Sequence, residues 1–164
     1  MLDDIDQQVL TLLERDDRIP REQIATMLGI PLEELASRIE RLEQERIILR
    51  YQAFVNWTKA DPDLVSALIE VRVAPQRDVG FDSIARRIAR FPEARSVYLV
   101  SGTYDIAVEV VGRTLRDVAS FVSEKLAPLE GVHGTTTHFL LKRYKEDGLQ
   151  LEEQEEATRL PLTP

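Results

Sequence analysis

Residues 20–44 read PREQIATMLGIPLEELASRIERLEQ, and this segment holds two helical patterns separated by a short turn. The first begins with Pro20, a residue favoured at helix starts, and Gly29 ends it. The second begins near Pro31, and its apolar residues recur at helical spacing: Leu35, Ile39 and Leu42. Two helices joined through residues 29–31 predict a helix-turn-helix.

Another helical pattern precedes this pair. Its apolar residues share one helix face: Ile5, Val9, Leu12 and Leu13. Residues 47–55 (IILRYQAFV) follow the pair and are rich in strand-forming residues, which predicts a strand leading out of this part of the chain. We therefore expect residues 1–58 to form a helix-turn-helix domain with an exit strand. Residues 59–63 (KADPD) have the composition of a linker.

Strand and helix patterns alternate through residues 64–145. Strands are expected over residues 64–73, 96–101, 104–111 and 135–144, and helices over residues 81–91 and 115–126. The order βαββαβ is that of a ferredoxin-like domain, so the fold class is α+β. Its helices cover one face of the sheet. The other face, with Leu68, Val100, Val108 or their alternating neighbours, needs a cover, and a second subunit is the economical one.

The composition excludes several classes of site. The chain has 164 residues, no cysteine and two histidines, so disulfides and zinc–thiolate sites are excluded and a histidine-rich metal site is not expected. No cofactor is expected. No run of 18 apolar residues exists that would span a membrane. The acidic start, Met1-Leu2-Asp3-Asp4, does not resemble an export signal, so we expect a cytoplasmic protein.

The charge is unevenly distributed along the chain. The net charge of −8 comprises −5 in residues 1–58, +2 in residues 59–145 and −5 in residues 146–164. A negative total argues against a simple nucleic-acid binder. Residues 146–164 are expected to form an acidic C-terminal tail. The tail either stays solvated, or Leu160 and Leu162 anchor it to a groove.

Several short motifs carry a resemblance to a known family. They stand at residues 2–6 (LDDID), 17–19 (DRI), 28–30 (LGI), 38–43 (RIERLE), 47–51 (IILRY), 102–105 (GTYD), 129–132 (LEGV) and 135–137 (TTT). In this order the chain resembles the Lrp/AsnC regulators over roughly residues 2–144. The resemblance implies a winged helix-turn-helix that binds double-stranded DNA, followed by an effector (RAM) domain. It also implies a homodimer, often assembled into an octamer, and an amino acid or related small effector bound where dimers meet.

The resemblance and the helical pattern together nominate residues for DNA contact. They are Arg21, Glu33, Ser37, Arg38, Arg41 and Arg50. Arginines suit phosphate or guanine, and a glutamate accepts a hydrogen bond from cytosine N4. Pro31 stands where the family commonly has a capping serine. Two other readings stay open: the charges form a solvated helix face, or the chain is an effector sensor whose DNA-binding head is weakened or lost.

The same reasoning nominates an effector site. Its candidates are Gly102, Tyr104, Asp105, Gly134, Thr135, Thr136 and Thr137. Asp105 would accept an α-ammonium group, and backbone N–H groups near Gly134 would hold a carboxylate. The alternative is a hairpin with a turn-stabilising aspartate beside a threonine-rich strand. Siroheme decarboxylases resemble the same two-part chain, but His133 and His138 are the only histidines and no nucleophile–base pair is visible. We therefore expect no enzyme.

Overall fold

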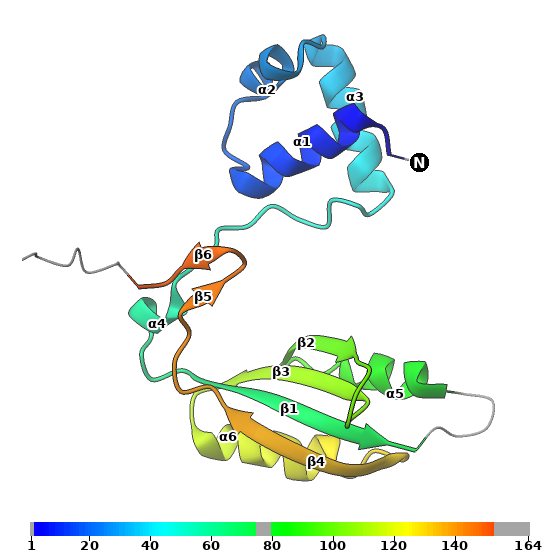
Figure 1. Ribbon diagram of the computed structural model, residues 1–164, viewed down its shortest axis with the longest axis vertical. Helices are drawn as coiled ribbons and strands as arrows, with labels where there is room; N and C mark the ends of the chain where they lie inside the picture. Colours follow the sequence, from blue (N-terminus) through cyan, green and yellow to red (C-terminus); the bar gives the residue numbers. More distant parts are fainter. Residues whose placement is uncertain (1, 75–79, 153–164) are drawn as a thin grey trace, which may run out of the picture. The chain divides into compact units, whose positions relative to one another are not determined.

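The computed structural model describes residues 2–74 and 80–152, and the chain divides into two compact units, Met1–Phe54 and Val55–Pro164 (Figure 1). The sequence analysis expected the first unit to end at residue 58. No helix within the described ranges is long and apolar enough to cross a membrane.

Three helices make up the first unit: α1 (Asp4–Arg15), α2 (Arg21–Leu28) and α3 (Leu32–Gln44). Gly29 ends α2 in the left-handed conformation, with φ of 66°. The expected apolar residues of all three helices pack into one core, with Val9, Ile24, Leu35 and Leu42 fully buried. This confirms the helix-turn-helix.

Two details of the first unit bear on the sequence predictions. Pro31 precedes α3 and supplies no side-chain hydrogen bond to its first turn, as expected without the capping serine. The exit strand expected over residues 47–55 is not formed in the structure. A strand needs a neighbour to satisfy its backbone groups, and no strand pairs with this segment among the described residues. At its start, the N–H groups of Ile47 and Ile48 instead bond the carbonyl of Leu42.

The second unit contains the expected βαββαβ order. The elements are α4 (Trp57–Ala60), β1 (Val65–Val73), α5 (Gly80–Ile88), β2 (Ala94–Leu99), β3 (Ile106–Gly112), α6 (Leu115–Ser120), η1 (Phe121–Leu126) and β4 (Val132–Phe139). The four-stranded sheet has the order β2-β3-β1-β4, and every neighbouring pair is antiparallel. The single helix expected over residues 115–126 is an α-helix that continues as the π-helix η1.

The two faces of the sheet differ in character. Ala67, Ile69 and Val71 of β1 are fully buried and pack with residues of α5, α6 and η1. We call the face that these helices leave uncovered the open face. Leu68 lies on it, but Val108 was placed there wrongly: it pairs with Ile69 and is fully buried toward the helices. The period-2 pattern fixes alternation but not which half turns inward. Val100 lies beyond the end of β2.

The C-terminal end of the second unit differs from the expectation. The last strand expected over residues 135–144 is β4, residues 132–139, and a short hairpin of β5 (Lys145–Glu146) and β6 (Leu149–Gln150) follows. Leu151 after it is buried, and its carbonyl accepts a hydrogen bond from the Asn56 side chain (2.9 Å). Residues 146–152 therefore belong to a hairpin that is anchored at Leu151, although they were expected in the tail. Leu160 and Leu162 lie outside the described residues.

Candidate functional site

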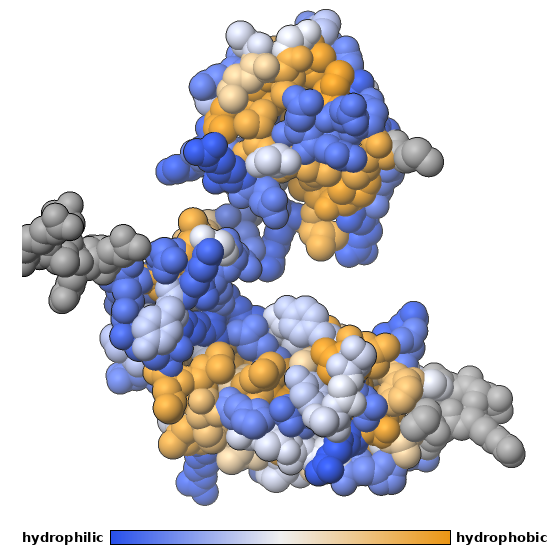
Figure 2. Space-filling model, viewed as in Figure 1, coloured by the Kyte–Doolittle hydropathy of each residue, from blue (hydrophilic) through white to orange (hydrophobic). Residues whose placement is uncertain are grey.

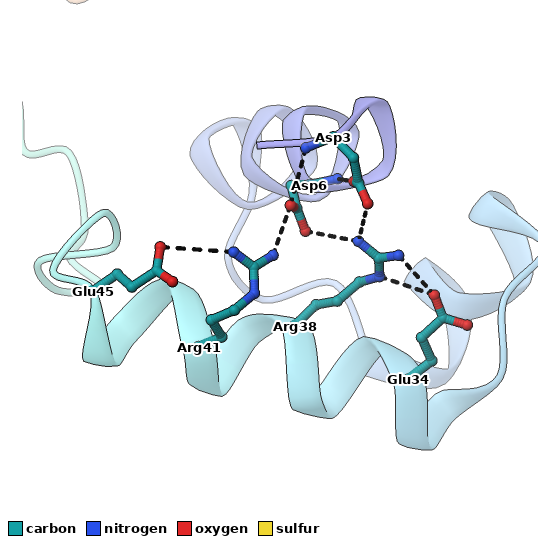
Figure 3. Close-up of polar contacts among 6 residues, drawn as sticks. All are labelled: Asp3, Asp6, Glu34, Arg38, Arg41 and Glu45. Carbon is teal, nitrogen blue, oxygen red and sulfur yellow. Dashed lines mark hydrogen bonds and ion pairs between the residues drawn. The ribbon is translucent and has the colours of Figure 1, made fainter. Parts of the chain in front are cut away.

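A buried carboxylate in the first unit joins α1 to α3. Asp6 is 1% exposed, and its two oxygens accept hydrogen bonds from Arg38 Nη1 (2.9 Å) and Arg41 Nη2 (2.6 Å) (Figure 3). We call Asp6, Arg38 and Arg41 the α1–α3 clamp. Arg38 and Arg41, two of the four arginines nominated for DNA contact, thus both point toward α1.

Three more acids surround the clamp, so that four carboxylates face its two arginines. Asp3 and Glu34 accept from Arg38 at 2.7 and 2.9 Å, and Glu45 lies 3.7 Å from Arg41. Burial alone would raise the pKa of Asp6, but hydrogen bonds from Arg41, the Asp3 backbone and Arg38 lower it to about 2. The hydrogen bond to Asp3, followed by those to Glu34 and Asp6, raises the pKa of Arg38 above its ordinary value. The clamp is therefore fully ionised at neutral pH.

The solvent side of α3 carries the other nominated residues of this helix. Glu33, Ser37 and Glu40 are exposed, and Gln44 donates to Glu40 (3.2 Å). With Arg38 and Arg41 in the clamp, this outward face presents carboxylates, a hydroxyl and an amide. The carboxylates accept hydrogen bonds from base amino groups and repel phosphates, whereas the hydroxyl and the amide can also donate hydrogen bonds.

Two of the arginines nominated for DNA contact, Arg21 and Arg50, lie outside α3 and have different surroundings. Arg50 is exposed after the end of α3. The Arg21 guanidinium lies 5.4 Å from the centre of the Tyr51 ring, and its Nη1 is shielded and has no hydrogen-bond partner in the part of the chain that the structure describes. Tyr51 in turn donates to Glu43 (2.7 Å). Burial and this carboxylate raise the pKa of Tyr51, so its hydroxyl stays protonated. Arg21 is thus backed by an aromatic ring at the first residue of α2.

In the second unit, Asp105 fastens the ends of three segments. Its carboxylate accepts a hydrogen bond from the Val73 N–H (2.8 Å), its N–H donates to Val71 (3.1 Å), and its carbonyl accepts from Val100 (2.9 Å). Gly102 lies exposed in the preceding loop with φ of 154°, and Tyr104 is half-buried. One carboxylate oxygen of Asp105 thus bonds the backbone of β1, whereas the alternative interpretation expected it to stabilise its own turn.

The glycine and threonines nominated on β4 lie along the other edge of β1. Gly134 pairs with Arg72, and Thr135 with Val71, so both strands neighbouring β1 bring nominated residues to the same end of this strand. Thr136 and Thr137 follow in register beside Glu70 and Ile69. Alternation places Thr136 on the open face and Thr135 and Thr137 on the helix side.

The sequence analysis missed Arg72 at this end of the sheet. Its guanidinium lies against Gly134: a Cβ atom added to Gly134 would stand 3.4 Å from Arg72 Nη2. Arg72 is exposed on the open face. The alternation within β1 predicted a polar position there, but the pairing with Gly134 depends on a register that one sequence does not reveal. On the same face, His138 Nε2 lies 3.2 Å from Glu70, whereas His133 is exposed.

Comparison with known proteins identifies a domain family for each of the two units. Residues 2–48 match the winged helix-turn-helix DNA-binding domain, and residues 66–150 match the Lrp/AsnC ligand binding domain. The chain belongs to the Lrp/AsnC family. It is a transcriptional regulator with a helix-turn-helix domain for DNA and a ligand-binding domain.

Individual members of the Lrp/AsnC family agree with this assignment along nearly the whole chain. The HTH-type transcriptional regulator YugG of Bacillus subtilis is 46% identical, covering 96% of this chain and 95% of its own. The leucine-responsive regulatory protein of Rhizobium meliloti is 32% identical, covering 92% and 96%. The regulator NMB0573 of Neisseria meningitidis, solved as a complex with L-Met, has the same fold with a TM-score of 0.71, 22% identity, and coverage of 92% and 97%.

Proposed function

We propose that the ligand is an amino acid and that it binds at the end of β1 where β3 and β4 flank this strand. The observation that carries the proposal is the position of Arg72 against Gly134, with Asp105 on the other side of β1. A guanidinium suits the α-carboxylate, and the free oxygen of Asp105 suits the α-ammonium. Gly102, Tyr104 and residues 134–137 complete the proposed site. The L-Met complex of NMB0573 supports the class of ligand.

A thermal-shift screen with the twenty amino acids tests this site. A ligand at 100 times its dissociation constant should stabilise the protein by about 2.7 kcal/mol. The shift should disappear in Arg72→Met and Asp105→Asn but persist in Arg116→Met, an exposed arginine on α6. If no amino acid shifts the melting temperature, the effector belongs to another class. A shift that survives both site variants would place the ligand elsewhere.

For the DNA-binding unit, we propose that separate residues contact the phosphates, face the bases and stabilise the fold. Arg21 and Arg50 contact phosphates, Glu33 and Ser37 face base edges beside Glu40, and Arg38 and Arg41 hold the unit together through the clamp. Arg50→Ala should then weaken binding to all sequences and lower the salt slope by about one, with an unchanged melting temperature. Arg41→Ala should lower the melting temperature. If no DNA selected from a random pool shifts in a gel at low salt, the sensor with a lost DNA-binding head is the correct reading.

The open face supports a further part of the proposal, the assembly. Figure 2 shows apolar and polar residues side by side on the surface of the second unit turned to the viewer. On the open face, Leu68 and Val111 are half-buried and Tyr98 is 56% exposed, which suits a second copy packing sheet against sheet. We propose a homodimer that associates further to an octamer. Light scattering behind a sizing column measures this, and a monomer at micromolar concentration would contradict it.

We also propose that the protein acts without catalysis and in the compartment that holds the chromosome, the cytoplasm. The family consists of regulators, and the DNA partner determines the place. The siroheme-decarboxylase alternative has a simple test, because purified protein mixed with siroheme should leave its main absorption band unchanged. A shifted band, lost in His133→Ala or His138→Ala, would favour the enzyme.

A further inference from the structure

The first two turns of α3 present side chains that the core of the first unit does not use. Those of Leu32, Glu33, Ala36 and Ser37 are all exposed. At 3.6 residues per turn they lie within an arc of about 140° around the helix, and we call them the reading face. In a helix-turn-helix, the N-terminal residues of the second helix contact base edges in the major groove. The chemistry of the reading face should therefore decide which bases the unit prefers.

No cation of α3 belongs to the reading face. This helix contains two arginines, Arg38 and Arg41, and no lysine. Figure 3 shows both guanidinium groups turned toward α1, where that of Arg38 meets three carboxylates and its side chain is only 19% exposed. Guanine presents two acceptors in the major groove, O6 and N7, and an arginine or lysine reads them best. The reading face thus lacks the group that selects guanine.

Glu33 is the charged member of the reading face. Within residues 2–74 and 80–152 its carboxylate has no ion-pair or hydrogen-bond partner. A carboxylate only accepts hydrogen bonds. In the major groove, cytosine offers the N4 donor and no acceptor, whereas guanine and thymine offer acceptors and adenine holds its N7 acceptor beside its N6 donor. Among the four bases, Glu33 therefore suits cytosine.

Leu32 and Ala36 give the reading face an apolar flank. They are four residues apart in the helix, so their side chains are neighbours on its surface. Leu32 is 38% exposed, and it belongs neither to the buried core of the first unit nor to the apolar residues packed against that core. The apolar group that a base edge offers in the major groove is the C5-methyl group of thymine. An exposed leucine beside an exposed alanine is therefore complementary to thymine.

We propose that the reading face selects adjacent pyrimidines. Leu32 and Ala36 contact the C5-methyl group of a thymine, and Glu33 accepts a hydrogen bond from N4 of a neighbouring cytosine. The hydroxyl of Ser37 both donates and accepts, so it tolerates several bases. This inference rests on the proposed function and deepens it, because it names the bases that α3 meets. A carboxylate in the first turn also favours the helix dipole, but that effect explains neither of the two exposed apolar residues beside Glu33.

Deoxyuridine tests the thymine contact, because it differs from thymidine only by the missing methyl group. The full chain first selects a duplex from a random pool, and each thymine of that duplex is then replaced in turn. At one position or more the affinity should fall roughly fourfold, the effect of one buried methyl group. This fall should disappear in Leu32→Ser/Ala36→Ser, whose fold circular dichroism checks. It should persist in Met27→Ser, a matched exposed apolar residue on α2.

A second selection, with Glu33→Gln, tests the cytosine contact. A glutamine amide both donates and accepts, and it pairs with N6 and N7 of adenine. The variant should therefore prefer adenine where the unchanged protein prefers cytosine, with a change in relative affinity of roughly fivefold or more. Glu14→Gln, an exposed glutamate on α1, is the matched control and should keep the preference for cytosine.

Three results would overturn the proposal. The first is a selected duplex in which no thymine methyl group matters, or in which the methyl effect survives in Leu32→Ser/Ala36→Ser. The second is a set of preferred bases that Glu33→Gln leaves unchanged. In both cases the protein still binds selected DNA, so the proposed function stands. The third is a selection that yields no bound DNA, which removes the proposed function of the first unit and this inference with it.

Discussion

At the scale of single residues, Asp6 is the group on which the first unit most depends. Its carboxylate is buried, and besides the local Asp3 N–H it accepts hydrogen bonds from two arginines of another helix, whose charge no local group supplies. Replacing Asp6 by asparagine would leave two arginines facing one neutral amide. The α1–α3 clamp therefore contributes to folding, although its arginines lie on the helix expected to read DNA.

We expect Asp6→Asn to destabilise the first unit by about 2 to 4 kcal/mol, toward the low end of the range for broken buried pairs because Arg38 and Arg41 partly reach solvent. Urea denaturation of the full chain, followed by circular dichroism at helical wavelengths, measures this. Asp4→Asn, two residues earlier and exposed, is the matched control and should cost much less. Equal losses of stability in the two variants would show that the α1–α3 clamp contributes no more to stability than an exposed carboxylate does.

The same carboxylate predicts a dependence on pH. The pKa of Asp6 is about 2 in the folded state, below its ordinary value of 3.8, so ionised Asp6 stabilises the fold. This contribution, about 2 kcal/mol, is complete above pH 3.8 and is lost as the pH falls toward 2. Denaturation of the first unit between pH 5 and 2 should show it. In Asp6→Asn the slope over this interval should flatten; an unaltered slope would assign the acid sensitivity to other carboxylates.

At the scale of elements, the two faces of the sheet predict which substitutions prevent assembly without unfolding the protein. Leu68→Arg places a charge on the open face and should yield a folded protein of lower mass, because two such faces would repel one another. Light scattering and circular dichroism together measure mass and fold. Leu115→Arg, exposed on α6, is the control and should keep the assembled mass. A full-size assembly of Leu68→Arg would move the interface to another surface.

The elements also show what a sequence can and cannot predict. Helices α1 to α3 and the βαββαβ order follow from local periodicity, which needs no knowledge of distant neighbours. The strand expected over residues 47–55 fails because strand-forming residues indicate a propensity, and a strand also needs a partner. The clamp escaped prediction for a related reason. Arg41 lies on the outward side of α3 by pattern, but its long side chain reaches Asp6, which is 35 residues away.

In the candidate effector site, too, some residues could be predicted from the sequence and others could not. The turn glycine and the strand that follows it were visible as a hairpin signal, so Gly102 and Asp105 could be nominated from the sequence. Arg72 became a candidate only through its register against Gly134 on β4.

At the scale of the whole molecule, charge should modulate DNA binding. Residues 153–164 hold three glutamates and one arginine, and the chain as a whole carries −8. A tethered acidic segment has a high effective concentration near the cations that contact DNA. We expect a chain ending at residue 152 to bind non-specific DNA several-fold more tightly at low salt and equally at high salt, because salt screens the segment. Ending the chain there keeps the β5–β6 hairpin and the Asn56–Leu151 bond.

A full-length variant separates charge from length in this experiment. Replacing Glu153, Glu155 and Glu156 by glutamine removes the charge and keeps every residue in place. It should reproduce the effect of the deletion. Equal affinities of the wild-type, shortened and neutralised chains at low salt would leave solubility as the role of the acidic residues.

The direction in which the α1–α3 clamp points has a consequence for how such regulators diverge. Residues that hold the fold and residues that face outward belong to the same helix but share no contact partner among the described residues. The DNA sequence that the protein prefers can therefore change during evolution without loss of the residues that stabilise the fold. Replacing residues 33, 37, 40 and 44 by those of a paralogue would then transfer the paralogue's preferred DNA sequence to this chain. The residues that stabilise the fold would stay unchanged.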